Sequence, residues 1–441
     1  MSTIPQVATA MQRVLGTVAD QVARRVKFVQ RESKLGGATF VQTLVFGWLS
    51  EAAATLEDLS QTAATRGVAI TPQGLDERFT SAAAACVQGV LDAAVSEVIT
   101  AEPAVIPLLQ RFQGVYIQDS TVITLPNALA AEWRGCGGSG DAGQAAVKLQ
   151  VRWELTTGAL AGPYLSDGRA SDRSSALHAT PLPVGSLLLR DLGYWDLEDL
   201  QARDQAGSFW LSRVMPGTIV FETAGRRWEV GAFLRAQPGT SVEVPIQLGG
   251  AARIPARLLA VRVPAEIANQ RRRAIHKVAR RKGQTPSQAT LALADWFVLA
   301  TNVPPTLLTL AEALVLARVR WQIELLFKLW KSEGLVDEWR SRNPWRILCE
   351  VYAKLLGLII QHWVLLVSCW QYPNRSLVKA VHTVHRHALH LASVFDQHDR
   401  LCAALTVIQR CLAVGCRINK RKAHPNAYQL LLEPSLQQWE L

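Results

Sequence analysis

Two acidic residues lie within or directly after predicted strands, where a carboxylate is uncommon. Asp119 lies inside the β-prone run Val115–Leu125, and Asp191 directly follows the apolar run Ser186–Arg190. Buried strands rarely take a carboxylate, because the charge loses its hydration there. Carboxylate oxygens are the ligands that Mg²⁺ prefers, so the pair predicts a magnesium site.

A third acid, Glu324, lies in an apolar helical stripe together with three cations. At 3.6 residues per turn, Arg320, Glu324, Lys328 and Lys331 fall on one side of a helix. One interpretation is a row of solvated ion pairs worth a few tenths of a kcal/mol each. The other is a third metal ligand. Two strand acids and one helix acid suit a pair of Mg²⁺ ions, which stabilise the attacking and leaving oxygens of an in-line phosphoryl displacement.

The order of acids (in a strand, after a strand, in a helix) resembles the DDE transposases of bacterial insertion sequences, specifically the IS-four family. That family carries a Tyr-x2-Arg-x3-Glu-x6-Lys signature around its third acid. Arg320, Glu324 and Lys331 match three of the four positions, whereas Ala317 stands where the family has tyrosine. This departure puts in doubt whatever the tyrosine does at the DNA backbone.

Further motifs follow the family order, and the resemblance runs from about residue 40 to about 370. They are Asp191-Leu-Gly-Tyr-Trp-Asp196, Ser208-Phe-Trp-Leu-Ser-Arg213 and Asp295-Trp-Phe-Val-Leu-Ala-Thr-Asn-Val-Pro304.

The resemblance implies a mechanism and assigns roles to named residues. Asp119, Asp191 and Glu324 would be the catalytic acids and would hold two Mg²⁺ ions, with Mn²⁺ able to substitute. Hydrolysis of the element end would be followed by a hairpin, its opening, and strand transfer into target DNA. Arg213, Arg320 and Lys331 would grip phosphates.

The family also places an aromatic residue where a flipped base stacks. Trp296 occupies that place in this chain. Stacking an extruded base on an aromatic ring is worth about 1–3 kcal/mol. Packing in the protein core is the alternative for this tryptophan.

Basic residues indicate a polyanionic partner. The formal net charge is +11 at pH 7, which is compatible with nucleic acid but does not establish it. The run 271–282 holds a dense cluster of cations without a wide apolar face, so we expect phosphate contacts from it, with a solvated surface as the alternative. The predicted contacts are Arg271, Arg272, Arg273, Lys277, Arg280, Arg281 and Lys282.

The chain predicts an α/β fold with an RNase H-like mixed-sheet catalytic core over residues 105–334. A β-rich insertion with the basic segment interrupts this core at 215–305. Residues 1–85 are expected to form a helical, helix-turn-helix-like DNA-binding domain, with helices Leu56–Thr65 and Pro72–Ala83. Residues 335–441 are expected to be helical, and the family resemblance implies that they could serve dimerisation.

Several classes of protein are disfavoured. The start of the chain lacks the apolar core of a signal peptide. The apolar stretch Leu355–Trp370 is interrupted by Gln361 and His362 and predicts a buried helix rather than a membrane span. Seven cysteines without a Cys-x2-Cys pair indicate reduced thiols. These features predict a protein with reduced thiols and no membrane partner, and the family resemblance implies a bacterial, cytoplasmic and nucleoid-associated one.

The expected partners are double-stranded DNA, namely the terminal inverted repeats of an element and its target DNA, with a homodimer in the DNA complex. Two alternatives remain at this stage. One is a catalytically impaired end-binding regulator, which Ala317 favours. The other is a structure-specific nuclease on the same RNase H-like scaffold, which would cut DNA without joining it.

Overall fold

A computed structural model describes residues 1–31, 34–137, 143–372, 374–418 and 425–436. The chain divides into two compact units. The first comprises Met1–Val105, Ser120–Leu177 and Ile323–Asn419, and the second comprises Ile106–Asp119, His178–Gln322 and Lys420–Leu441. The backbone passes repeatedly between the units, and strand β1 (Val115–Leu125) contributes residues to both.

Ten strands form one mixed sheet in the order β3-β2-β1-β4-β5-β10-β9-β8-β6-β7. Strand β4 is parallel to both β1 and β5, whereas the other recorded pairs are antiparallel. The remaining strands are β2 (Ala145–Glu154), β3 (Leu160–Asp167), β4 (Leu187–Arg190), β5 (Phe209–Arg213), β6 (Ile219–Glu222), β7 (Arg227–Glu229), β8 (Ser241–Leu248), β9 (Ile254–Arg262) and β10 (Trp296–Thr301). The predicted α/β class with a mixed sheet is confirmed.

The parallel strands are joined by helical crossovers, as parallel pairing requires. Helix α7 (Ala176–Ala179) precedes β4, and α8 (Leu197–Gln205) connects β4 to β5. After the first three strands, helix and strand therefore alternate as α7, β4, α8 and β5.

The strands expected between residues 217 and 262 extend the same sheet beyond β10. Alternate side chains of β8 and β9 enter an apolar core that includes Trp210, Phe233 and Trp296. The other helices of the second unit are α9 (Val230–Arg235), α10 (Ala265–Arg281), α11 (Gln288–Ala292), α12 (Leu310–Val319) and α17 (Ala427–Leu432).

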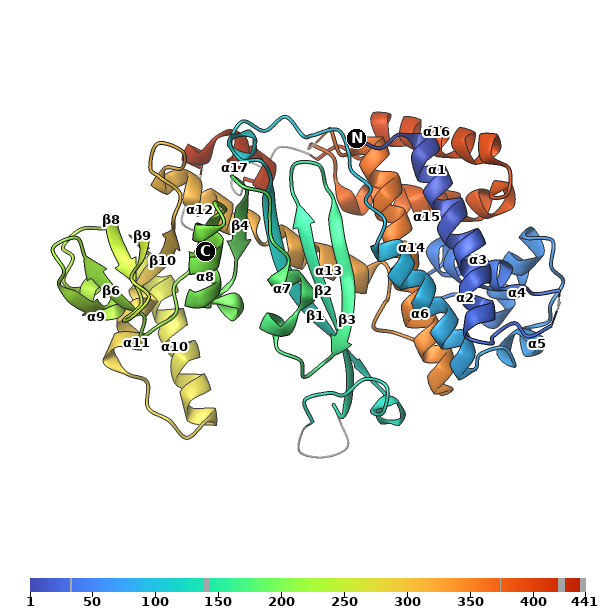
Figure 1. Ribbon diagram of the computed structural model, residues 1–441, viewed down its shortest axis with the longest axis horizontal. Helices are drawn as coiled ribbons and strands as arrows, with labels where there is room; N and C mark the ends of the chain where they lie inside the picture. The colour runs from blue at the N-terminus through green and yellow to red at the C-terminus, as the bar shows by residue number, and fades with distance from the viewer. Residues whose placement is uncertain (32–33, 138–142, 373, 419–424, 437–441) are drawn as a thin grey trace. The chain divides into compact units, whose positions relative to one another are not determined.

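Helix α14 (Pro344–Cys369) is the core element of the first unit. Asn343 caps it by accepting from the backbone N–H groups of Trp345 and Arg346, and Pro344 occupies its first turn. It packs against α1, α3, α6, α15 and α16 (Figure 1). Among the described residues it is the one helix long and apolar enough to cross a membrane, yet 94% of its most apolar window is buried inside the protein. The prediction of a buried helix is confirmed.

The remaining helices of the first unit surround α14 or precede it in the chain. They are α1 (Ile4–Gln12), α2 (Ala19–Arg25), α3 (Gly37–Ser50), α4 (Leu56–Thr65), α5 (Pro72–Asp76), α6 (Ser81–Val95), α13 (Gln322–Ser332), α15 (Leu377–Val394) and α16 (His398–Val414), with a π-helical segment, η1 (Arg13–Val18), between α1 and α2.

One predicted helix boundary is wrong. Helix α4 has its predicted limits, but the predicted helix Pro72–Ala83 is broken into α5 and α6. The Thr80 hydroxyl accepts from the backbone N–H of Ala83 and starts a new helix at Ser81. A second side-chain cap, at Thr80, therefore divides the segment that was predicted as one helix. The DNA-binding role of residues 1–85 stays a prediction.

Candidate active site

Asp119 lies within β1, and Asp191 directly follows the neighbouring parallel strand β4. Ile117 of β1 is paired with Leu189 of β4, and each aspartate lies two residues further along its strand direction. Because side chains alternate along a strand, the two carboxylates project from the same face of the sheet. Pairing of β1 with β4 thus brings together two acids that are 72 residues apart in the chain (191 − 119).

Arg320 holds a position between these two carboxylates. Its guanidinium lies 3.4 Å from Asp119 Oδ2 and 3.9 Å from Asp191 Oδ2, and its side chain is only 12% exposed. Arg320 follows the last turn of α12 as its C-terminal cap residue. A single cation therefore offsets the repulsion between two acids at the sheet edge.

Asp191 has one carboxylate oxygen that the protein does not satisfy. Its Oδ1 is buried and has no hydrogen-bond partner in the described part of the chain. Such oxygens are uncommon in folded proteins and often mark a place for an ion or water. Mg²⁺ is usually held by one or two carboxylates together with substrate phosphates, so the Asp119–Asp191 pair suits this ion.

The third predicted ligand, Glu324, belongs to the other compact unit. Across the described ranges, no three His, Cys, Asp or Glu side chains gather into a metal-holding group. The metal-binding role of Glu324 therefore stays a prediction.

Helix α13 presents Glu324 half-buried in its first turn, where the helix dipole favours an acid. The apolar face of the helix, with Ile323, Phe327 and Trp330, is buried. Near the other end, Lys331 Nζ donates to the Val122 carbonyl of β1 at 3.1 Å and lies 3.8 Å from Asp337 Oδ2. Lys331 was predicted to grip phosphate, and in this structure it anchors α13 within the first unit.

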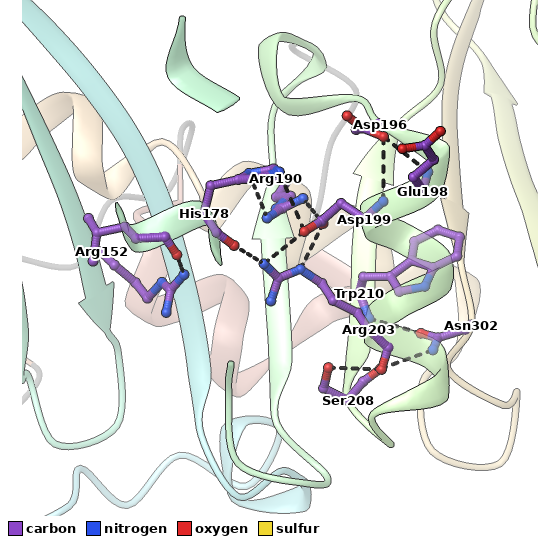
Figure 2. Close-up of polar contacts among 11 residues, drawn as sticks. Arg152, His178, Arg190, Asp196, Glu198, Asp199, Arg203, Ser208, Trp210 and Asn302 are labelled. Carbon is purple, nitrogen blue, oxygen red and sulfur yellow. Dashed lines mark hydrogen bonds and ion pairs between the residues drawn. The ribbon is translucent and has the colours of Figure 1, made fainter. Parts of the chain in front are cut away.

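A charged cluster lies at the end of β4, immediately before Asp191. The Arg190 side chain is fully buried and donates to Asp199 Oδ2, which also accepts from Arg203 Nε at 2.8 Å. Arg203 Nη2 donates to Asp199 Oδ1 at 3.1 Å and to the His178 carbonyl at 2.9 Å. Figure 2 shows Arg190, Arg203 and His178 arranged around the Asp199 carboxylate. These four residues are called the Arg190 cluster below.

Burial and mutual contact shift the ionisation of this cluster. Burial lowers the pKa of Arg190 to about 10, and the nearby Arg203 charge adds to that effect. Burial alone would raise the pKa of Asp199, but the guanidinium groups of Arg190 and Arg203 outweigh it and lower that pKa. Burial, followed by the Arg190 charge, lowers the pKa of His178. The cluster is therefore a carboxylate between two arginines, beside a neutral imidazole.

Sequence reasoning missed the Arg190 cluster. The Asp199–Arg203 spacing of four residues on an expected helix was a visible signal. The contact of Arg190 with Asp199 was not, because it depends on the turn that brings the start of α8 back to the end of β4.

Two predicted motifs meet between β5 and β10. Asn302 Oδ1 accepts from the Trp210 backbone N–H at 2.8 Å, and its Nδ2 donates to the Ser208 carbonyl at 3.1 Å (Figure 2). The same Nδ2 also donates to Asp204 Oδ1 at 2.8 Å. Thr301 Oγ1 donates to the Trp210 carbonyl. These residues therefore fasten β10 to the strand that follows α8.

The basic run lies on α10, where its members divide into two groups. Arg271 donates to the Trp296 carbonyl at 3.1 Å, and Arg272 pairs with Asp295, so these two attach the helix to its neighbours. The remaining cations are exposed. They are Arg273, Lys277, Arg280, Arg281 and Lys282, called the exposed α10 cations below.

Trp296 and Arg213 lie in different surroundings. Trp296 is 3% exposed within the second unit's core, and the Arg262 guanidinium sits 4.5 Å from its ring centroid. This is the core placement kept as the alternative, and base stacking by Trp296 stays a prediction. Arg213 is exposed, with its guanidinium 5.6 Å from the Phe297 ring centroid, so it is accessible to a phosphate.

Comparison with known proteins gives one family and several relatives. The family model described as "Transposase DDE domain" matches residues 110–360. The transposase for insertion sequence element IS231F from Bacillus thuringiensis subsp. israelensis is 27% identical over 364 residues, covering 77% of this chain and 76% of the relative. The transposase for IS231D from B. thuringiensis subsp. finitimus is 24% identical over 442 residues, covering 92% and 90%.

A more distant relative comes from another bacterium. The putative transposase InsL for insertion sequence element IS186A from Escherichia coli K12 is 27% identical over 267 residues, covering 58% of this chain and 67% of the relative.

Proposed function

This chain belongs to the DDE transposases, since the family model covers more than half of it, and on that premise we propose that it moves an insertion sequence by cut-and-paste transposition. The observation that supports this most is the pair of carboxylates, Asp119 and Asp191, set on adjacent parallel strands around one arginine. The buried Asp191 Oδ1, which has no hydrogen-bond partner among the described residues, fits the same role.

The proposed catalytic residues are Asp119, Asp191 and Glu324, which would hold Mg²⁺ or Mn²⁺. Ions bound there would stabilise the attacking and leaving oxygens of an in-line phosphodiester displacement. Without DNA, the Arg320 guanidinium offsets the repulsion between the two aspartates. The same guanidinium is within the site to contact a phosphate, because arginine recognises carboxylate and phosphate oxygens alike.

The DNA path is proposed to include cations away from the acids. The exposed α10 cations and Arg213 lie in the second unit without an acidic partner recorded in the described part of the chain. Such cations release counterions from DNA and supply affinity without sequence preference. Sequence-specific recognition of the terminal inverted repeats is assigned to residues 1–85, and dimerisation in the DNA complex to 335–441. The protein would act in the bacterial cytoplasm at the nucleoid.

More specifically, we propose that the chain belongs to the IS-four family of DDE transposases and excises its element through a DNA hairpin. The spacing of Arg320, Glu324 and Lys331 supports it. Ala317 lies half-buried on α12, one turn before Arg320, where the family has tyrosine. For that reason an end-binding regulator without cleavage activity is kept as a second candidate function.

The test is an incubation of purified protein with Mg²⁺ and DNA that carries the inverted repeats flanking its gene. Products are resolved on a denaturing gel, and binding is followed in parallel by gel shift. A hairpin followed by an excised fragment supports the hairpin route, and nicks without hairpins support the acids but not that route. Binding without cleavage supports the regulator, and cutting of branched DNA regardless of end sequence supports a nuclease.

A further inference from the structure

The Arg190 cluster is placed where it can control the direction of Asp191. Arg190 is the last residue of β4, and Asp191 is the next residue. Because successive side chains of a strand point to opposite faces, Arg190 enters the protein on one face while Asp191 leaves on the other. Whatever fixes the Arg190 guanidinium therefore fixes the backbone from which Asp191 projects.

The segment after Asp191 is tied at its far end as well. Asp196 begins α8 by accepting from the backbone N–H groups of Glu198 at 3.0 Å and Asp199 at 3.4 Å. This cap starts the helix so that Asp199 falls in its first turn and Arg203 one turn later. The short turn from Asp191 to Asp196 thus returns the chain to Arg190.

The hydrogen bonds of the cluster define its protonation. Arg190 Nη2 lies 3.3 Å from His178 Nδ1, and since a guanidinium can only donate, this ring nitrogen accepts. The ring proton is therefore on Nε2, which faces Asp199 Oδ1 at 3.5 Å. Every partner of Asp199 in the cluster is thus a donor, and this one carboxylate orients Arg190, Arg203 and His178.

The Asp191 carboxylate makes few contacts of its own with the described residues. Its Oδ1 lacks a partner in the described residues, and its Oδ2 is 3.9 Å from Arg320. The direction of this carboxylate is therefore set mainly by its own backbone.

We infer that Asp199 is a positioning residue for Asp191: through Arg190, it holds the end of β4 in the geometry that lets Asp191 bind a divalent metal. The inference rests on the proposed function, because it assumes that Asp191 is a metal ligand. Without the Asp199 charge, two buried arginines face each other with no carboxylate between them, and Arg190 has to move. A metal site tolerates displacements of only about 0.5 Å in its ligands, so movement at Arg190 would weaken binding at Asp191.

The test measures metal binding directly rather than cleavage. Mn²⁺ binding to the full-length protein is followed by electron paramagnetic resonance, for the wild type and for Asp199→Asn, Asp191→Asn and Glu198→Gln. Glu198 is exposed in the same turn of α8, so Glu198→Gln removes the same charge without touching Arg190. Thermal unfolding of each metal-free protein is measured alongside.

We expect Asp199→Asn to raise the Mn²⁺ dissociation constant about 10-fold, at the lower end of the effect of removing a partner that orients a metal ligand. Asp191→Asn should abolish this binding, and Glu198→Gln should leave it unchanged. Asp199→Glu, which restores the charge, should recover part of the affinity. If Asp199→Asn lowers the unfolding temperature but binds Mn²⁺ like Glu198→Gln, the cluster is only structural and the inference is overturned.

Two further outcomes are separable. If Asp199→Asn does not fold, Arg203→Lys takes its place, since it keeps the positive charge but loses the two-pronged contact with Asp199. Unchanged Mn²⁺ affinity in a folded Arg203→Lys protein would equally overturn the inference. If the wild-type protein binds no Mn²⁺, or Asp191→Asn binds as well as wild type, the metal site of the proposed function fails instead.

Discussion

Replacement of Lys354 by methionine should destabilise the protein through a charge that it leaves behind. Lys354 and Glu350 are one turn apart on α14, and their side chains are 2% and 4% exposed. Lys354 Nζ donates to Glu350 Oε1 at 2.7 Å and to the carbonyls of Leu335 at 3.0 Å and Glu338 at 2.9 Å. Those carbonyls belong to the segment that follows α13, so this lysine joins the helix of Glu324 to the core of the first unit.

The size of the destabilisation follows from the burial of Glu350 and Lys354. Methionine matches the length of lysine but leaves Glu350 buried without its cation and leaves two carbonyls without a donor. Breaking a buried ion pair by removing one partner costs about 3–5 kcal/mol. The double change Lys354→Met with Glu350→Leu removes the stranded charge too, so it should be more stable than Lys354→Met alone.

The loss should also depend on pH. Burial raises the pKa of Glu350, and Lys354 opposes that rise. Without Lys354 the pKa of Glu350 in the folded protein should move further up. A carboxyl whose pKa is raised on folding takes up a proton in the folded state first, so stability is regained as pH falls toward the ordinary value. The destabilisation by Lys354→Met should therefore be larger at pH 8 than at pH 5.

Urea unfolding at pH 8 and pH 5, followed by tryptophan fluorescence, measures these free energies of unfolding. Lys277→Met on the exposed side of α10 is the matched control and should change stability by less than about 0.5 kcal/mol. A loss for Lys354→Met that is no larger than that of the control, or one that is equal at both pH values, would refute the account of a desolvated pair.

Three other predictions concern the DNA path, the β5–β10 junction and a buried histidine. Replacing the exposed α10 cations with glutamine should weaken DNA binding and reduce the slope of log affinity against log salt by about 0.9 for each phosphate that is no longer neutralised. Gel shifts at salt concentrations from about 50 to about 200 mM measure this slope. An unchanged slope would show that α10 does not contact the DNA. Arg272→Gln, by contrast, should act on thermal stability. Asn302→Ala loses a set of hydrogen bonds and should cost about 2–3 kcal/mol in urea unfolding; a cost below about 0.5 kcal/mol would show that the junction does not depend on it. Burial lowers the pKa of His362 to about 4. The stability of the wild-type protein should therefore fall as pH drops from the ordinary histidine pKa of 6.5 toward 4. Thermal unfolding over that range should show a smaller fall in stability for His362→Gln than for the wild type.

The sequence was sufficient where local pattern decides structure. Alternation and β-branched residues located the strand around Asp119, and an apolar run located the one before Asp191, because strand propensity and burial act within a few residues. That these two strands pair with each other is seen only in the structure. Helix α14 was likewise predictable, since Gln361 and His362 interrupt its apolar run.

The sequence was insufficient where a side-chain contact depends on how separate helices and strands fold against one another. Arg190 lies nine residues from Asp199 in the chain, and their contact depends on the turn that brings the start of α8 back to the end of β4. Trp296 could equally have been a core residue or a stacking platform, because an aromatic in a strand suits both, and its burial in the core becomes visible only once β9 and β10 are paired. The break at Thr80 arises from a single cap that apolar periodicity does not reveal.

The most direct test of the central claim is a change of metal specificity at Asp191. Cleavage of terminal-repeat DNA is measured for the wild type and for Asp191→Cys, first in Mg²⁺ and then in Mn²⁺, with Glu198→Cys as the control. A thiolate is a poor ligand for Mg²⁺ but binds softer transition metals. If Asp191 holds the metal, Asp191→Cys should be inactive in Mg²⁺ and regain cleavage in Mn²⁺, whereas the control should cut in both. Activity of Asp191→Cys in Mg²⁺ equal to the wild type would contradict the assignment of Asp191 as a metal ligand.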